Sequence, residues 1–286
     1  MRFRTEIETG RGSFEIAHSD RIVMLGSCFT DNIGQRLECD GFDAVYNPLG
    51  PLYNPFSLAR LIEDMLDGRR YEASDFVVDA EGVSHCLDFA SKYQSGDAQA
   101  LADELNLRMA LLAGQLRSAS LLVVTFGSSV VYSLTSAADG TVGNCHKFPS
   151  SMFSRLTLTV EQIVERWTPL VARLKAMGVR LIFTVSPIRH LADGLHGNQL
   201  SKARLLLACE RLTADYADYF PSYEIMLDDL RDYRFYAADM KHPSEQACDY
   251  IYETFQQKYF SKATMSEALR CRERALRLSH RPIITT

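Results

Sequence analysis

Five short runs of mostly apolar residues predict the strands of this chain. They cover residues 22–25, 42–46, 121–126, 180–185 and 223–227. Continuous apolar runs, without strict alternation with polar residues, are typical of strands covered on both faces. We therefore expect a five-stranded parallel sheet.

Between these runs, apolar residues recur at helical spacing. The predicted helices cover residues 30–38, 58–66, 97–116, 160–177, 199–219 and 244–259. Ser57 is a suitable N-cap for the second helix, and Gly68 is a suitable residue to end it. Strands that alternate with helices predict right-handed crossovers and an α/β domain with helices on both faces of the sheet.

Several segments depart from this alternation. Residues 76–87 contain a turn at 79–82 between two short apolar runs and predict a hairpin insertion, and Asp139–Gly140 predicts the tip of a second hairpin. The proline-rich loop 47–55 cannot be helix or central strand, because proline has no N–H to donate. We expect one domain over residues 1–260 and a C-terminal helical extension over residues 261–286.

The turn after the first strand is the first candidate for chemistry. Ser27 follows Gly26 at the predicted carboxyl end of the strand and precedes a helix whose first N–H groups are free to bind an anion. A serine in this place is a candidate nucleophile. The alternative is an ordinary turn residue, because Gly-Ser pairs are common in turns.

A second stretch, far along the chain, supplies what an activated serine needs. Asp239 and His242 lie three residues apart in one loop before the last helix of the domain. An imidazole within hydrogen-bond reach takes the proton of the hydroxyl, and a carboxylate fixes the tautomer of the imidazole. We predict that Ser27, His242 and Asp239 form a catalytic triad.

Composition narrows the function without choosing it. The formal charge of −5 lacks the basic excess of a nucleic-acid binder, and no window is apolar enough for a membrane span. The seven cysteines are scattered and contain no Cys-x-x-Cys pair, so we expect neither a disulfide framework nor a zinc ribbon. Together with an N-terminus that has no signal-peptide core, this predicts a cytoplasmic protein. Composition says nothing about oligomeric state.

Other catalytic motifs are absent from the sequence. There is no Gly-x-Ser-x-Gly elbow, phosphate-binding loop, His-Glu-x-x-His pair or dinucleotide-binding Gly-x-Gly-x-x-Gly. We therefore expect no cofactor and no metal in the reaction.

The serine near the start and the Asp-x-x-His near the end resemble the SGNH (GDSL-like) hydrolase superfamily. Within it, Gly26-Ser27-Cys28-Phe29 is similar to the signature that names the GSCFA family, with Thr30 where that name has alanine. Further likeness lies in residues 47–55, 125–128, 144–147, 186–190, 198–202 and 232–236. The resemblance covers most of the chain and implies a flavodoxin-like three-layer α/β/α sandwich.

The resemblance also implies an oxyanion hole. Its donors would be the backbone N–H of Ser27, the N–H of Gly50 in the loop after the second strand, and Ser129 in the position where SGNH enzymes usually carry asparagine. Gly50 is equally well explained as a turn glycine. A hydroxyl at position 129 makes the hole weaker than an amide would, unless other groups complete it.

Four further residues are candidates for substrate binding. Asn144 and His146 follow the second predicted hairpin and are candidates to complete the oxyanion hole. Arg189 and His190 lie at the carboxyl edge of the sheet, where open α/β sheets bind ligands, and can meet an anionic or acyl group. For His146, Arg189 and His190 an ordinary loop position is the alternative.

The leading hypothesis is thus a serine esterase that hydrolyses a small acyl or carbohydrate ester. One alternative is an O-acyltransferase with the same triad, which differs in how well water is excluded. Another is a ligand-binding module whose catalytic power has decayed, which the serine at position 129 keeps open. A pocket lined by aromatic residues such as Tyr53, Tyr132 or Phe148 would favour a sugar or aromatic ester.

Overall fold

A five-stranded parallel sheet lies at the centre of the protein, which we describe from a computed structural model covering residues 5–136 and 140–279. Its strands are β1 (Arg21–Gly26), β2 (Asp43–Tyr46), β6 (Leu121–Phe126), β10 (Arg180–Val185) and β11 (Asp218–Phe220). They lie in the order β11-β10-β6-β1-β2, and all neighbours are parallel. This is the flavodoxin-like strand order, so the predicted fold class is confirmed.

The fifth strand was misplaced by the sequence prediction. Residues 223–227 belong to a short helix, α6 (Ser222–Leu227), and the edge strand β11 lies just upstream. Phe220 pairs with Thr184 of β10, and Pro221 ends the strand because it has no N–H to donate. The preceding helix, α5 (Gly194–Leu212), accordingly ends before the predicted boundary. A short apolar run does not by itself distinguish a buried strand from a buried helix.

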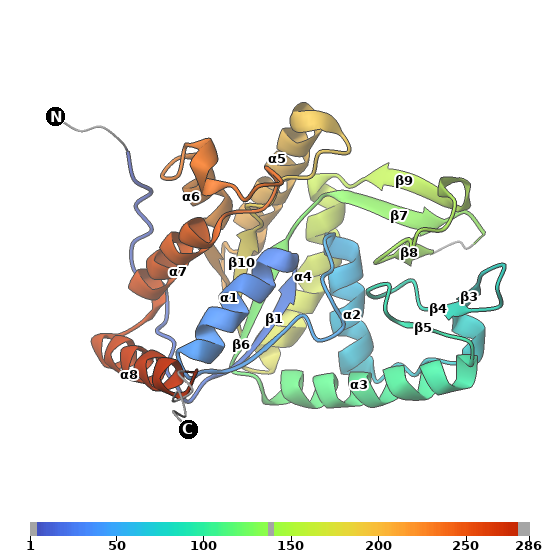
Figure 1. The fold of residues 1–286 in the computed structure, drawn as a ribbon, viewed down its shortest axis with the longest axis horizontal. Helices are drawn as coiled ribbons and strands as arrows, with labels where there is room; N and C mark the ends of the chain where they lie inside the picture. Colours follow the sequence, from blue (N-terminus) through green and yellow to red (C-terminus); the bar gives the residue numbers. More distant parts are fainter. Residues whose placement is uncertain (1–4, 137–139, 280–286) are drawn as a thin grey trace, which may run out of the picture.

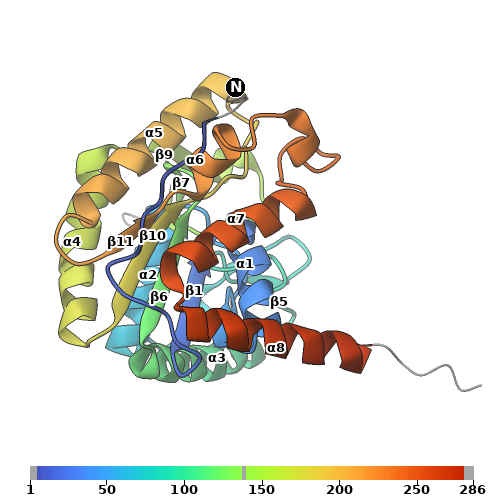
Figure 2. The same ribbon diagram turned by 90° about the vertical axis from the view of Figure 1, so that its left-hand side faces the viewer.

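Helices cover both faces of the sheet, as Figures 1 and 2 show. Alternate residues of β1 face opposite ways: Val23 and Leu25 join one core cluster, and Ile22 and Met24 join the other. The first cluster contains residues of α2 (Pro55–Asp67), α3 (Ala98–Ser118), α4 (Val160–Ala176) and α5. The second contains residues of α1 (Cys28–Cys39), α6, α7 (Glu245–Tyr259) and α8 (Lys262–Ser279).

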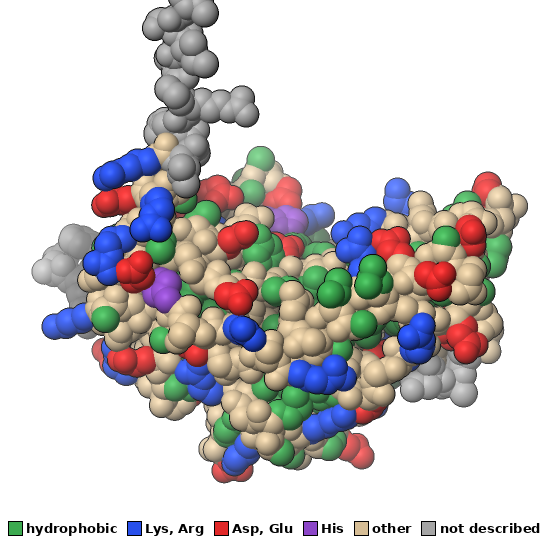
Figure 3. All heavy atoms as spheres, turned by 90° about the horizontal axis from the view of Figure 1, so that it is seen from below, with side chains coloured by type: hydrophobic (Ala, Val, Ile, Leu, Met, Phe, Trp, Pro, Cys, Tyr) green, Lys and Arg blue, Asp and Glu red, His purple; other side chains and the backbone are tan. Residues whose placement is uncertain are grey.

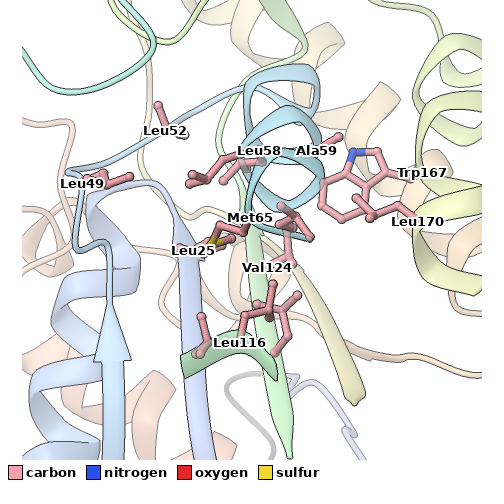
Figure 4. Packing of buried hydrophobic residues seen from close by; sticks show 14 of the residues in the cluster. Leu25, Leu49, Leu52, Leu58, Ala59, Met65, Leu116, Val124, Trp167 and Leu170 are labelled. Atoms are coloured by element: carbon pink, nitrogen blue, oxygen red, sulfur yellow. The ribbon is translucent and has the colours of Figure 1, made fainter. Parts of the chain in front are cut away.

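The core between the sheet and α2–α5 is closed around one tryptophan. Trp167 of α4 is fully buried among Phe126 and Phe183 of the sheet, and its indole N–H donates to Pro55 O at 3.0 Å. Figure 4 shows this side chain beside residues of α2 and β6. The start of α2, which lies close to the turn after β1, is thereby fixed to the core.

Two small antiparallel sheets are inserted into the α/β domain. One contains β3 (Val77–Val78), β4 (Ser84–His85) and β5 (Gln94–Ser95), and the other contains β7 (Val130–Leu134), β8 (Thr141–Val142) and β9 (Phe153–Thr157). Both predicted hairpins are confirmed as strand pairs, although Asp139, at the predicted tip of the second, lies outside the described residues. Both insertions lie on the same side of the domain in Figure 1.

The remaining helical turns are single 3-10 segments: η1 (Ala73–Asp75), η2 (Ser150–Met152) and η3 (Tyr233–Phe235). The lead-in segment runs along the β11 edge and α7, where Gly12 N donates to Lys258 O at 2.9 Å (Figure 2). At the other end of the chain, the guanidinium of Arg272 in α8 makes two hydrogen bonds of 2.8 Å to the fully buried carboxylate of Asp40. The predicted C-terminal helix therefore packs on the domain.

The face of the molecule shown in Figure 3 carries no patch of uniformly positive or uniformly negative charge. Acidic and basic side chains are interspersed on this face, with small apolar areas between them. In the described part of the chain, no helix combines the length and the apolar character needed to span a bilayer.

Candidate active site

The turn between β1 and α1 is built around a close approach of two strands. Gly26 has φ +150°, and a Cβ at this position would lie 2.3 Å from Thr125 O of β6. Only glycine fits here. The order of the sheet reverses between β1 and β6, and this switch point is where open α/β sheets form their binding crevice.

Asn47 holds this turn in place. Its side-chain oxygen accepts from Gly26 N at 2.9 Å, and its amide donates to Ser27 O at 3.1 Å and to Asp31 Oδ1 at 2.8 Å. Asn47 itself has φ +39°, a conformation that asparagine tolerates better than most residues. The first residue of the predicted loop 47–55 thus positions the start of α1.

Ser27 occupies the N-cap of α1 and is almost fully buried. Its hydroxyl accepts from Phe29 N at 3.3 Å and donates to Ser186 Oγ at 2.9 Å. Within the described residues, no hydrogen bond joins Ser27 to His242. The hydroxyl predicted to share a proton with the imidazole is instead part of the helix cap.

The residue that meets the imidazole is Cys28, the first residue of α1. Its Sγ lies 3.7 Å from His242 Nε2 and 3.7 Å from the hydroxyl of Tyr53. His242 Nδ1 in turn lies 2.5 Å from Asp239 Oδ2. Thiol, imidazole and carboxylate are therefore connected in the order that nucleophilic catalysis requires.

The carboxylate of Asp239 is held in its ionised form. Hydrogen bonds from the N–H of Lys241, the side chain of His242 and the N–H of His242 lower its pKa well below the usual range. An ionised Asp239 accepts from His242 Nδ1–H, which leaves Nε2 as the basic nitrogen facing sulfur. The pKa of the Cys28 thiol, in contrast, is raised, mainly by burial.

The predicted oxyanion donors are used by the fold. The N–H of Ser27 donates to Thr125 O at 3.3 Å, and that of Gly50 closes a turn onto Asn47 O at 2.8 Å. Gly50 is a glycine because φ is +89° and a Cβ would lie 2.4 Å from Ala90 Cβ. Ser129 is fully buried against Ser201, to which both its N–H and its hydroxyl donate. In this structure the predicted donors of these three residues are thus paired within the fold, and their oxyanion role stays a prediction.

Other donors face the cavity beside Cys28. This cavity has a volume of about 540 Å³ and is lined by Ser27, Cys28, Tyr53, Ser128, Asn144, Arg189, His190 and His242, among others. Among the described residues, the Cys28 N–H donates to none, and Asn144 accepts from His146 N through its oxygen while its amide N–H groups donate to none. Backbone N–H, amide and hydroxyl donors are thus available around the sulfur.

The walls of the cavity are mainly apolar and aromatic. Tyr53 and Tyr132 line it together with Val130, Val142 and Ile188, whereas Phe148 lies beside a different cavity. Two of the three aromatic residues that the sequence suggested are therefore present. Walls of this kind accept a flat ring or an acyl chain better than a strongly hydrated group.

Arg189 and His190 line the cavity as the sequence suggested. The guanidinium of Arg189 lies 3.8 Å from the centre of the Tyr236 ring and makes no ion pair among the described residues. His190 Nε2 is buried without a hydrogen-bond partner, and its Nδ1 lies 3.7 Å from Asp193 Oδ2. Burial, and then the charge of Lys202, lower the pKa of His190.

His146 does not face this cavity. Its ring is buried against His85 of β4, and it lines a second cavity together with Asp79 and Phe148. The structure therefore separates His146 from the cavity beside Cys28, and its contact with substrate stays a prediction. Its neighbours Asn144 and Cys145 do line the first cavity, so the loop lies between the two.

Lys202 of α5 lies beneath the cavity and was not singled out by the sequence. Its side chain is 1% exposed, and Nζ donates to Gly127 O and Ser186 O, both at 2.7 Å. Burial without a carboxylate lowers its pKa to about 7. Lys202 ties the chain after β6 to the chain after β10, and both segments form the floor of the cavity.

The sequence offered one signal for Cys28. Serine is among the best N-cap residues, so Gly26-Ser27-Cys28 before a helix predicts a capping serine and places the cysteine at the first helical position. Tyr53 was named only as a possible aromatic residue of the pocket, and Ser128 and Lys202 only as members of the stretches 125–128 and 198–202.

Comparison with known proteins gives one family match. A model described as the GSCFA family matches residues 21–255 of the chain. No curated protein matches its sequence.

Three solved structures show similarity over most of their length. The psychrotrophic esterase EstA of Pseudoalteromonas sp., inhibited by monoethylphosphonate, is 12% identical over 84% of this chain and 96% of its own, with a TM-score of 0.39. A putative acylhydrolase of Bacteroides fragilis is 11% identical over 89% of this chain and 91% of its own, with a TM-score of 0.44. A GDSL-like lipase of Bacteroides thetaiotaomicron is 12% identical over 83% of this chain and 86% of its own, with a TM-score of 0.42.

Proposed function

The chain belongs to the GSCFA family, and from this premise we propose that it is an acyl hydrolase in which Cys28 is the nucleophile, His242 the base and Asp239 the residue that orients the base. The observation that carries the proposal is the pair of contacts from His242, to Cys28 Sγ at 3.7 Å and to Asp239 Oδ2 at 2.5 Å. Cys28 and His242 both line one cavity.

The reaction follows from these positions. His242 Nε2 takes the thiol proton while sulfur attacks the acyl carbonyl, and the developing oxyanion is bound by the Cys28 N–H and by free donors such as the Asn144 amide. His242 then returns the proton to the leaving alcohol, and the acyl group stays on sulfur as a thioester. Water, deprotonated by His242, releases the acid and restores the thiol.

The thiol is protonated before substrate binds. Burial raises the pKa of Cys28, and neighbouring carboxylates such as Asp31 raise it further. The N-terminus of α1, where Cys28 is the first residue, favours the thiolate, but burial is the largest influence and the net shift of the pKa is upward. The proton therefore moves during the attack and is not transferred beforehand to form a resting ion pair.

The cavity supports a small acyl ester whose alcohol part is a sugar or an aryl ring. Tyr53 and Tyr132 provide the flat surfaces on which such rings stack. We also propose that Arg189, His190 and Asn144 contact substrate, and that Arg189 meets any anionic group on it, because its guanidinium has no carboxylate partner in the described chain. Arg189→Gln then raises KM for 4-nitrophenyl hemisuccinate and leaves KM for uncharged 4-nitrophenyl butyrate unchanged.

The two adjacent nucleophile candidates are separated by matched variants. With 4-nitrophenyl acetate and an acetylated sugar as substrates, Cys28→Ala lowers kcat/KM by about 10³-fold or more, whereas Ser27→Ala lowers it by less than about tenfold. The reverse pattern would return the nucleophile to Ser27. Loss in neither variant, with turnover above background, would contradict both assignments.

The same assay tests the alternatives. Faster release of 4-nitrophenol when alcohols are added, with the acyl group recovered on the alcohol, would show an O-acyltransferase. Binding of acetylated sugars without turnover by the unmodified protein would show a binding module.

A further inference from the structure

Two buried histidines meet outside the active cavity. His85 lies in β4, His146 follows β8, and their Nδ1 atoms lie 3.3 Å apart. The side chains are 6% and 8% exposed. The contact joins the two inserted sheets.

The Nε2 atom of each ring lies beside an oxygen that can only accept a hydrogen bond. His85 Nε2 lies 2.8 Å from Asp79 Oδ2, and His146 Nε2 lies 3.0 Å from the backbone oxygen of Phe89. The other oxygen of Asp79 accepts from the N–H of Val83 at 2.8 Å and from that of Glu81 at 3.1 Å, so this carboxylate acts as an acceptor in each of these contacts. An ionised carboxylate and a carbonyl have no hydrogen to donate, so both histidines carry their proton on Nε2.

This assignment leaves two lone pairs facing each other. A neutral imidazole has one N–H, and here it is on Nε2 in both rings, so neither Nδ1 can donate to the other. Two buried acceptors 3.3 Å apart repel each other and have no partner. The arrangement is favourable only if an electron-pair acceptor lies between them.

We infer that His85 and His146 bind a divalent transition metal ion such as Zn²⁺ through their Nδ1 atoms. With Zn–N distances of about 2.0–2.1 Å and a tetrahedral angle, two ligand nitrogens lie about 3.3–3.4 Å apart, which matches the observed 3.3 Å. Metal-binding histidines also commonly donate their other N–H to a carboxylate or a backbone carbonyl, as both rings do here.

The remaining ligands are water. A cavity of about 450 Å³ adjoins both histidines and is also lined by Asp79, Glu81 and Lys147. In the residues that the structure describes, no three His, Cys, Asp or Glu side chains gather closely enough to hold a metal. The site therefore has two protein ligands and binds the ion more weakly than a closed four-ligand site.

The backbone around His146 is strained in a way that serves this contact. His146 and Lys147 have φ values of +46° and +64°, which are uncommon for residues other than glycine. Such strain persists where the surroundings fix it, often at ligand sites. Asn144 and Cys145 precede His146 and line the active cavity, so the ion also fixes one wall of that cavity.

A proton is the competing occupant. It would make one ring an imidazolium whose Nδ1–H donates to Nδ1 of the other ring. The separation of 3.3 Å is longer than usual for a hydrogen bond between nitrogens.

Calorimetric titration of chelator-treated protein with zinc chloride tests the inference. We expect one zinc ion per chain, no saturable binding to His85→Gln or His146→Gln, and about 10–100-fold weaker binding to Asp79→Asn, which keeps both ligands. His196→Ala, which removes an exposed histidine of α5, is the matched control and binds as the unmodified chain. Circular dichroism establishes that each variant is folded.

Nitrogen-15 spectra of the histidine rings provide a second readout. Without metal, both rings are neutral with the proton on Nε2, and zinc shifts the Nδ1 resonances of the two. Zinc binding unaffected by His146→Gln, absence of saturable zinc binding, or one ring found as an imidazolium at neutral pH would overturn the inference. None of these outcomes depends on whether Cys28 is a nucleophile.

Discussion

Replacement of Lys202 by methionine tests whether its hydrogen bonds to Gly127 and Ser186 stabilise the floor of the cavity beside Cys28. Methionine has a similar length and no charge, so the change removes the amino group and its two hydrogen bonds with little change in volume. The carbonyls of Gly127 and Ser186 then lose their partner. Each unsatisfied buried acceptor costs about 1–3 kcal/mol, so with two acceptors we expect the unfolding free energy at pH 9 to fall by about 2–6 kcal/mol.

The dependence on pH is the sharper part of the prediction. Burial lowers the pKa of Lys202 from 10.5 to about 7 in the folded protein. Between these values the unfolded chain binds more protons than the folded chain, so stability from this group rises with pH. From pH 6 to pH 9 the rise is about 3 kcal/mol.

Urea denaturation of both proteins at pH 6, 7.5 and 9 measures this directly. The unmodified chain gains stability relative to Lys202→Met as pH rises, because the variant lacks the titrating group. If the two curves stay parallel across this range, Lys202 keeps its proton, and the reasoning from burial is refuted.

Three further substitutions test the candidate catalytic loop, the turn after β1 and the attachment of α8 to the domain. Asp239→Asn keeps an oxygen for the N–H groups of the loop but presents an amide to His242 Nδ1, so we expect kcat to fall by about 10³-fold with folding unchanged, measured by 4-nitrophenyl acetate hydrolysis. Gly26→Ala brings a Cβ to 2.3 Å from Thr125 O, so we expect loss of activity and a Tm lowered by more than 10 °C in differential scanning calorimetry. Arg272→Ala leaves the buried Asp40 without its cation, and we expect about 2–3 kcal/mol less stability in urea, less than for a fully buried pair because Arg272 is partly exposed.

The sheet could be predicted from local patterns almost completely. The runs that became β1, β6 and β10 are continuous and apolar because helices cover both their faces, and this signal is strong. The edge strand β11 is three residues long and half-covered, and the adjacent run in α6 is more apolar. At the edge of the sheet the apolar pattern is weaker, and the strand was therefore predicted in α6 instead of β11.

The sequence predicted which loops meet at the candidate site better than it predicted which side chain faces His242. The turn after β1 and the loop with Asp239 and His242 do meet at one cavity, because parallel strands end at the same edge. Which of two neighbouring side chains faces His242 depends on whether the helix starts at position 27 or 28. The helix starts at position 28, with Ser27 as its cap accepting from Phe29 N, and the same hydroxyl donates to Ser186, 159 positions away in sequence.

The hydrogen-bond partners of the predicted oxyanion donors could not be recognised from the sequence for a related reason. Gly50 and Ser129 occupy the predicted loops, but their N–H groups are satisfied by Asn47 and Ser201, and neither partner can be recognised from local sequence. Backbone donors in a folded protein are usually paired, so a free donor can be found only once all partners are known.

Trapping of the acyl intermediate tests the central claim most directly. The protein is mixed with excess 4-nitrophenyl acetate, quenched in acid within seconds, digested and analysed by mass spectrometry. We predict an acetyl group on Cys28 in the peptide from the start of α1, removed by neutral hydroxylamine as a thioester is, and absent from His242→Ala. An acetyl group on Ser27 that resists hydroxylamine would contradict the account.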